Sequence, residues 1–166
     1  MPWLTRPCVG TLTSVDIEGP VAGVADQCER VLRTLPLWFG IESSLMEYVR
    51  DTERFPTFVA RAAVEVVGFV TIRQHFADAW EVNCIAVAAH VRNQGVGRAL
   101  HTYIEQWLLA QGARLLQVKT LADSHPSAEY AETRRFYSSV GYVALEVFPN
   151  LWAPRLPVLQ LVKTLR

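Results

Sequence analysis

The sequence predicts an α/β domain built on a mixed sheet with helices packed against it. The chain has 166 residues, of which 51% are hydrophobic, enough for one core and too few residues for two comfortable domains. Residues 80–87 alternate in the manner of a strand, whereas from Val96 apolar residues recur every three or four positions, as on one face of a helix. We therefore expect residues 1–166 to form a single domain.

The other elements follow from the same two periodicities and from the positions of proline. Pro20 is placed to begin a helix, Pro36 to end it, and Pro56 to precede the sheet. We expect strands at 8–17, 57–62, 66–76, 80–87, 115–120, 142–148 and 158–164, and helices at 21–35, 42 to about 51 and 96 to about 112.

The junction between strand 80–87 and the helix after it is the most informative feature of the chain. The strand leads through R-N-Q-G-V-G, residues 92–97, directly into the helix. The first N–H groups of a helix lack intrahelical partners and its dipole makes this end positive, so a pyrophosphate is a natural ligand. Gly95 and Gly97 let the backbone approach the anion, and Arg92 can add a bidentate contact. The plainer alternative is a turn that binds nothing.

Two other phosphate-binding motifs do not match this junction. A dinucleotide fingerprint requires a third glycine where the chain has Leu100, and an acidic residue roughly 20 residues on, where residues 117–121 read QVKTL. A Walker loop is absent from the sequence. The pattern R-x-x-G-x-G after an apolar strand resembles instead the acetyl-CoA signature of the GNAT N-acetyltransferase superfamily.

The resemblance covers about residues 65 to 148 and does not rest on the glycines alone. After the strand 115–120 comes T-R-R-F-Y-S-S-V-G-Y, in which Tyr137 and Gly141 fall on the family pattern. The resemblance implies a mixed sheet of about six or seven strands flanked by about four helices, the fourth ending near Gly141. The chain departs from the pattern at Tyr130 and Thr133, where many members have asparagine and alanine, which bears on the pantetheine contacts.

Acetyl-CoA is the co-substrate that the resemblance implies. Its expected binding residues are Ile85, Ala86, Val87, Arg92, Asn93, Gln94, Gly95, Val96, Gly97 and Arg98. Ile85 and Val87 would bond to the pantetheine arm as a neighbouring strand does. The backbone N–H near Val87, where the strand bulges in the family, would donate to the developing oxyanion.

Acetyl transfer to an amine requires an uncharged nucleophile, and only about one alkylamine in a thousand is neutral at pH 7. Histone acetyltransferases place a catalytic glutamate at the offset of Glu81, so the resemblance implies Glu81 as general base, acting directly or through one water. Tyr137 matches the family tyrosine that reaches the CoA sulfur and is the expected general acid. Glu81 could instead be an ordinary polar residue at the strand's entrance, and Tyr137 a core aromatic, although Phe136 could fill that role.

The acceptor, a small-molecule or peptide amine, is expected among aromatic side chains of linkers and loops. The residues expected to contact it are Trp38, Phe39, Trp80 and Asn83, with His75, His125, Tyr130 and Trp152 as further candidates. The zero net charge does not favour a polyamine over a small amine, an amino acid or a protein amino group. O-acetylation and a non-catalytic acyl-CoA sensor or interaction module are alternatives; the presence of both Glu81 and Tyr137 favours an enzyme.

The composition limits which binding partners and which cellular compartment we expect. Lys plus Arg equals Asp plus Glu at 16 each, so nucleic acid is not an expected partner. The three cysteines match neither a zinc site nor a disulfide framework, and the four histidines have no metal-site spacing, so no metal is predicted. Without a charged leader or an apolar run of ~18 residues, we expect a cytoplasmic protein outside the membrane. The apolar strand 158–164 is expected to be a sheet edge through which a homodimer could form.

Overall fold

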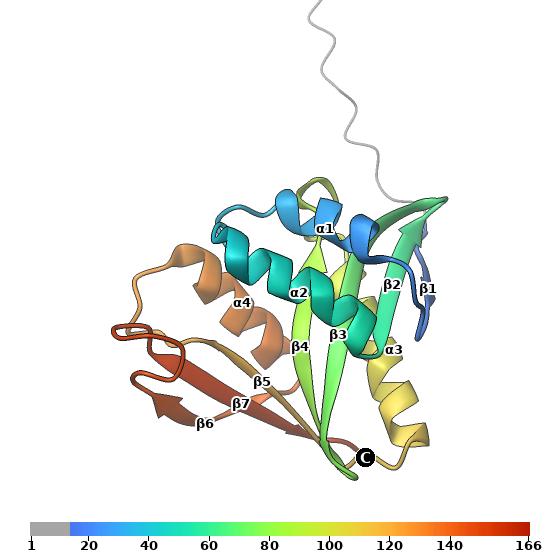
Figure 1. The fold of residues 1–166 in the computed structure, drawn as a ribbon. Coiled ribbons are helices and arrows are strands. Elements are labelled where there is room, and N and C mark those ends of the chain that lie inside the picture. Colours follow the sequence, from blue (N-terminus) through green and yellow to red (C-terminus); the bar gives the residue numbers. More distant parts are fainter. Residues whose placement is uncertain (1–13) are drawn as a thin grey trace, which may run out of the picture.

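The computed structural model describes residues 14–166 (Figure 1). Within these residues the strands are β1 (Asp16–Glu18), β2 (Thr57–Ala62), β3 (Glu65–Phe76), β4 (Ala79–Val87), β5 (Leu115–Leu121), β6 (Val143–Phe148) and β7 (Val158–Thr164). The helices are α1 (Ala25–Arg33), α2 (Glu42–Arg54), α3 (Val96–Ala110) and α4 (Ala128–Ser139), with a 3₁₀ turn, η1 (Ala89–Val91), before α3. The mixed sheet with four helices confirms the predicted fold class.

The seven strands form one sheet in the order β1-β2-β3-β4-β5-β7-β6. All neighbours are antiparallel except β4 and β5. The prediction that 158–164 is an edge is wrong, because β7 lies between β5 and β6 and pairs with β5 along all of its residues. The edge on this side is β6, where Val143, Leu145 and Val147 are exposed.

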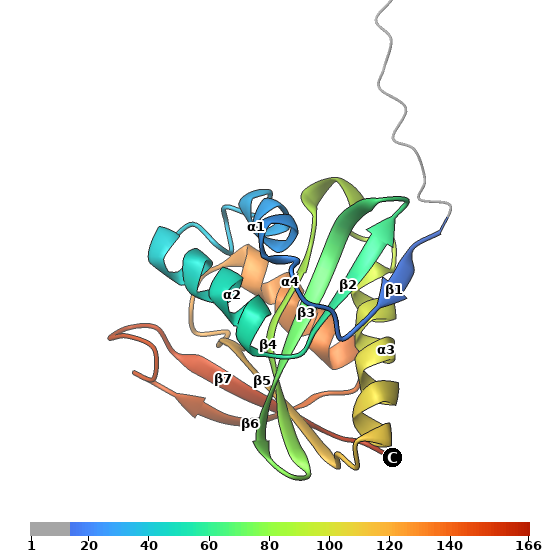
Figure 2. The same ribbon diagram turned by 45° about the vertical axis from the view of Figure 1, so that its right-hand side comes forward.

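The parallel pair β4–β5 is joined over only part of its length. Residues 79–82 pair with residues 115–118, and beyond Val82 and Val118 the two strands diverge, as Figures 1 and 2 show. Each strand still pairs on its outer side, β4 with β3 as far as Val87 and β5 with β7 as far as Leu121. The inner edges of the two strands therefore face each other across a gap without strand partners.

Helices pack against both faces of the sheet. α1 and α2 lie against one face, and α3 lies against the other (Figure 2). α3 approaches β3 at Gly68, where an added Cβ would lie 3.2 Å from Val96 Cγ1 and 3.3 Å from Leu100 Cδ1. A larger residue at 68 would push α3 away from the sheet, so this glycine sets the position of the helix.

A β-bulge changes which side chains of β4 face α3. Val82 pairs with Ile72 and Cys84 with Thr71, so Asn83 is the extra residue. In a regular strand, residues 80 and 87 would point to opposite faces, yet Trp80 packs on Trp107 of α3 and Val87 lies beside Gly97 at its start. The expectations of a bulge near Val87, and of Glu81 and Val87 on one face, are therefore wrong.

Other helix and strand ends differ from the predicted ones where local hydrogen bonds override the hydrophobic periodicity. α1 begins at Ala25 rather than at residue 21, because Val21 N–H donates to Thr57 O (2.8 Å) and Gly23 has a φ of 72°. α2 continues to Arg54, three residues past the expected end. Strands 57–62 and 158–164 are confirmed, whereas residues 8–13 of the expected first strand lie outside the described residues.

Cys28 and Cys84 are both buried free thiols, and Cys8 lies outside the described residues. Burial raises the pKa of the Cys28 thiol to about 12 and raises that of Cys84 still further, because ionisation would leave a charge away from water. Within residues 14–166, none of the helices has the length and apolar character that crossing a bilayer requires.

A buried polar chain ties α3 to the segment that follows α4. The ring of His101, 1% exposed, contacts Glu105 through Nδ1 (2.8 Å) and the Tyr142 hydroxyl through Nε2 (2.9 Å). Lys163 of β7 pairs with Glu105 and also donates to Val140 O (2.5 Å). The ammonium and carboxylate charges compensate each other, so the imidazole can stay neutral; burial lowers the pKa of His101 to about 4.

Truncation of Leu100 tests the packing of α3 on the sheet. Leu100 is 0% exposed, so Leu100→Ala should lower the free energy of unfolding by about 2–5 kcal/mol through lost contacts and a cavity. Leu109, in the same helix but 41% exposed, is the matched control, and Leu109→Ala should cost less than about 1 kcal/mol. Urea denaturation measures both; equal losses would contradict the packing described.

The depressed pKa of His101 makes stability depend on pH. Because the folded pKa of about 4 lies below the ordinary 6.5, the unfolded chain binds the proton more readily, and stability is lost as pH falls from 6.5 toward 4. Between pH 7 and 4.5 this group should lower the free energy of unfolding by about 2–3 kcal/mol.

Denaturation of the wild type and of His101→Gln at both pH values measures that contribution. The variant should lose less stability on acidification than the wild type. The exposed His90 provides the control, since His90→Gln should retain the wild-type pH dependence. A pH dependence unchanged in His101→Gln would refute the assignment.

Candidate active site

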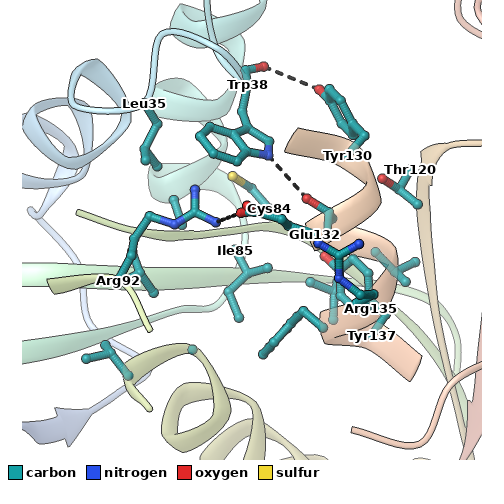
Figure 3. Close-up of a pocket in the computed structure, with 18 of the residues that line it drawn as sticks. Leu35, Trp38, Cys84, Ile85, Arg92, Thr120, Tyr130, Glu132, Arg135 and Tyr137 are labelled. Atoms are coloured by element: carbon teal, nitrogen blue, oxygen red, sulfur yellow. Dashed lines mark hydrogen bonds and ion pairs between the residues drawn. The ribbon is translucent and has the colours of Figure 1, made fainter. Parts of the chain in front are cut away.

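A cavity of about 710 Å³ opens where β4 and β5 separate (Figure 3). Its walls are residues 82–87 of β4, residues 118–120 of β5, the start of α3, α4 and the α1–α2 linker. The predicted site residues that line it are Trp38, Phe39, Asn83, Ile85, Ala86, Val87, Arg92, Asn93, Gly95, Val96, Gly97, Arg98 and Tyr137. Glu81, Trp80 and Gln94 are not part of its wall.

The glycine turn adopts the backbone conformation that an anion cradle requires. Asn93 and Gly95 have φ values of 60° and 85°, both in the left-handed region, and α3 begins immediately afterwards at Val96. No side chain caps this end of α3. The first N–H groups of the helix and the positive end of its dipole therefore face the cavity, where they can hold a phosphate group.

Arg92 reaches across the cavity from the glycine turn. Its guanidinium carbon lies 4.1 Å from the ring centroid of Trp38, and Nη2 donates to Glu132 Oε2 of α4 at 3.1 Å (Figure 3). Arg98 of α3 donates to the backbone carbonyl and hydroxyl of Ser139 at 3.3 and 3.0 Å. The start of α3 and α4 are thus joined by two arginines that line the cavity.

Trp38 connects the α1–α2 linker with α4. Its indole Nε1–H donates to Thr133 Oγ1 (3.2 Å), and the Tyr130 hydroxyl donates to Trp38 O (3.4 Å), as the dashed lines of Figure 3 show. Tyr130 and Thr133 are the two positions at which the sequence departs from the family pattern. Both are used here to hold Trp38 at the cavity wall.

Tyr137 lies 4% exposed at the cavity wall, between the rings of Phe136 and Tyr142, each with its centroid 5.4 Å away. Burial raises the pKa of Tyr137 well above its ordinary range, so its hydroxyl remains protonated and able to donate a hydrogen bond. The Cys84 thiol, which also lines the cavity, is kept protonated for the same reason and is a poor nucleophile.

Glu81 lies behind the cavity wall in a cluster of polar side chains. Its Oε1 lies 2.8 Å from Lys119 Nζ, and its Oε2 lies 2.5 Å from His75 Nε2 and accepts from Gln117 Nε2 at 3.4 Å. The Glu81 side chain is 13% exposed. Lys119 does line the cavity, so the wall includes the ion-pair partner of Glu81 but not Glu81 itself.

The remaining predicted residues divide between the wall and the core. Asn83 at the bulge donates through Nδ2 to Asp51 Oδ2 of α2 at 3.0 Å, which fixes its amide. Trp80 packs edge-on against Trp107, with ring centroids 5.7 Å apart, and is turned away from the cavity. Trp152 of the β6–β7 loop does line the cavity, whereas His125 does not. Residues 14–166 contain no cluster of three His, Cys, Asp or Glu side chains that could hold a metal ion.

Several wall residues were not predicted from the sequence. They are Leu35, Tyr48, Val82, Cys84, Val118, Lys119, Thr120, Glu132, Thr133, Arg135, Phe136 and Ser139. Lys119 and Thr120 belong to a strand whose alternation the sequence displays, and they reach the cavity because β5 leaves β4 after Val118. The length of that pairing has no sequence signal, whereas the spacing of Glu132 and Arg135 around Phe136 could have placed them on one helical face.

Comparison with known proteins agrees with this architecture. The profile of the Acetyltransferase (GNAT) family matches residues 27–142. No curated protein matches the chain in sequence. Among solved structures, a GNAT-family protein from Desulfovibrio desulfuricans superimposes with a TM-score of 0.81 at 19% identity, covering 92% of this chain and 100% of the other.

Two further solved structures share the fold. An aminoglycoside 6'-N-acetyltransferase complexed with coenzyme A has a TM-score of 0.72 at 21% identity, covering 91% of this chain and 97% of its own. The ribosomal-protein-S18-alanine N-acetyltransferase of Escherichia coli has a TM-score of 0.75 at 17% identity, covering 92% and 94%. With the family profile matched over most of its length, and a glycine turn opening on the gap between β4 and β5, the chain belongs to the GNAT acetyltransferase family.

Proposed function

We propose that the protein transfers the acetyl group of acetyl-CoA to a primary amine by direct attack in a ternary complex. The observation that carries this proposal is the shared cavity: the uncapped start of α3, the separated strands and the protonated Tyr137 hydroxyl all face one space. A cofactor bound with its phosphates on α3 would place its thioester in the gap between β4 and β5. The amine would then approach from the side of the α1–α2 linker.

The pyrophosphate would bind the N–H groups at the start of α3, with Arg92 and Arg98 as counter-ions. The pantetheine arm would lie along the unpaired edge of β4, where Ile85 and Val87 can bond to it as a partner strand would. A backbone N–H of this edge, near Val87, would donate to the oxyanion that forms on the thioester carbonyl. Gln94, which is not part of the wall, would contribute through the backbone of the turn.

During transfer the amine nitrogen forms a bond to the acetyl carbon and the carbon–sulfur bond breaks. Glu81 would accept the proton that the amine loses, and since Glu81 is not part of the cavity wall, we propose that it acts through one water. Tyr137 would donate a proton to the departing CoA thiolate. The products are an N-acetylated amine and CoA, and Tyr137 regains its proton from solvent as Glu81 releases its own.

The proposed phosphate contact of Arg92 can be measured directly. Arg92→Gln should weaken CoA binding by about ten- to a hundredfold, because a hydrogen bond to a charged group contributes about 1.5–3 kcal/mol. Isothermal titration calorimetry measures the Kd. Arg50 of α2 is exposed and not part of the cavity wall, so Arg50→Gln is the control and should bind CoA normally. An unchanged Kd in Arg92→Gln would remove Arg92 from the site.

The proposed catalytic roles predict losses in rate without losses in CoA affinity. Tyr137→Phe and Glu81→Gln should each lower kcat by about 10²–10⁴-fold, the usual contribution of a positioned acid or base. Tyr103→Phe, on α3 and outside the cavity wall, is the control. Product formation is followed by mass spectrometry against amines, amino acids, aminoglycosides, lysine peptides and hydroxyl acceptors, without thiol reagents because of Cys8, Cys28 and Cys84.

Full activity in both variants would refute the catalytic assignment while leaving the family intact. Transfer to hydroxyl compounds in preference to amines would replace N-acetylation by O-acetylation. If no acceptor is acetylated although acetyl-CoA binds, the wild-type protein would be the sensor or interaction module instead.

A further inference from the structure

The charges that line the cavity are unevenly distributed. Arg92, Arg98, Lys119 and Arg135 are cationic, and among the lining residues that the structure describes Glu132 is the one carboxylate. Glu132 is itself paired with Arg92 at 3.1 Å. A polycationic acceptor would therefore find no unpaired carboxylate on this wall.

Two of the arginines belong to the phosphate end of the cavity. Arg92 and Arg98 flank the start of α3, whereas Arg135 lines the cavity from α4. A polyanionic cofactor accounts for this cluster. Lys119 stands apart on β5, one residue past Val118, where the pairing with β4 ends.

Lys119 is held at the cavity wall and has unused hydrogen-bond donors. Its Nζ contacts Glu81 Oε1 at 2.8 Å, and the second oxygen of Glu81 is occupied by His75 at 2.5 Å. An ammonium has three N–H donors, and Glu81 is the partner of Lys119 among residues 14–166. The carboxylate orients Lys119, and the remaining donors are available to a ligand.

The next residue of β5, Thr120, carries an unused donor on the opposite face of the strand from Lys119. The Thr120 side chain is 2% exposed and lines the cavity, yet its Oγ1 has no hydrogen-bond partner among the described residues. Figure 3 shows this side chain on the strand that borders the cavity. A buried hydroxyl without a partner is uncommon, and one at a cavity wall is explained by a ligand that bonds to it.

Aromatic side chains form another part of the cavity wall. Tyr48 of α2, Tyr130 of α4 and Trp152 of the β6–β7 loop all line it, and Trp152 is 46% exposed. Such a surface favours an apolar or aromatic body rather than a hydrated, multiply charged one.

We propose that the acceptor is an amine that also carries a carboxylate and an apolar side chain, as in an apolar or aromatic amino acid. Lys119 binds the carboxylate, and the aromatic wall encloses the side chain. This inference deepens the proposed function and rests on it for turnover. An aminoglycoside or a polyamine would instead bring its positive charge against Lys119.

Binding by calorimetry to the full chain in the presence of CoA tests the acceptor class. The ligands are leucine, methionine, phenylalanine and tryptophan, each beside its amide and its decarboxylated amine, with spermidine and kanamycin as polycations. At least one amino acid should bind about ten- to a hundredfold more tightly than its own amide and amine, since the carboxylate gains a charge-assisted bond. Equal affinities throughout, no binding of any amino acid, or tighter binding of a polycation would overturn the proposal.

Variants test whether Lys119 of β5 causes the tighter binding of an amino acid than of its amine. Lys119→Gln should abolish the difference between amino acid and amine while the amine itself still binds, and Lys119→Arg should keep the difference. Because Lys119→Gln also removes the partner of Glu81, Glu81→Gln serves as a second variant; it removes the same ion pair but retains the ammonium, so the binding preference for the amino acid over its amine should persist. A preference that survives in Lys119→Gln would overturn the role of Lys119.

Mass spectrometry of the same mixtures with acetyl-CoA separates this inference from the proposed function. Preferential binding of amino acids without any acetylated product would refute the transferase and leave the carboxylate site standing. Acetylation of amines regardless of a carboxylate would refute the carboxylate site and leave the transferase standing.

Discussion

The structure depends on where β4 and β5 stop pairing. Two parallel strands that remained hydrogen-bonded throughout would close the sheet and leave no room for a ligand. Here the ladder ends at Val82 and Val118, and each strand is kept in place beyond that point by its outer neighbour. The outer strands therefore hold the gap open, and the backbone groups along it remain available. The bulge at Asn83 lies at the same point, and it turns the residues beyond it so that Val87 faces α3.

Side chains from distant parts of the sequence close the cavity that this gap creates. Trp38 is held through its indole by Thr133, through its carbonyl by Tyr130 and across its ring by Arg92. These contacts join the α1–α2 linker to α4 and to the glycine turn. The departure of Tyr130 and Thr133 from the family pattern thus has a structural role in this chain, which is to anchor an aromatic residue of the wall.

The electrostatics of the two ends of the cavity differ for a physical reason. Arginines gather at the start of α3, where the helix dipole already favours an anion. On β5, the Lys119 ammonium is paired with Glu81, whose second oxygen is bound by His75. This ion pair orients the positive charge of Lys119. Glu81 itself is not part of the cavity wall, which is why it acts through a water, and not by direct contact with the ligand, in the proposed reaction.

Local pattern was enough for the fold class, most of the strands and the glycine turn, because periodicity and left-handed glycine positions are properties of neighbouring residues. Most of the expected cofactor residues therefore line the cavity. The tertiary structure alone decided the place of β7 inside the sheet, the position of the bulge and the length of the β4–β5 pairing, all of which depend on residues far apart in the chain. For that reason Trp80 and Glu81, adjacent to the site in sequence, face a core tryptophan and Lys119 instead, while Lys119 and Thr120 reach the cavity without any signal in their own segment.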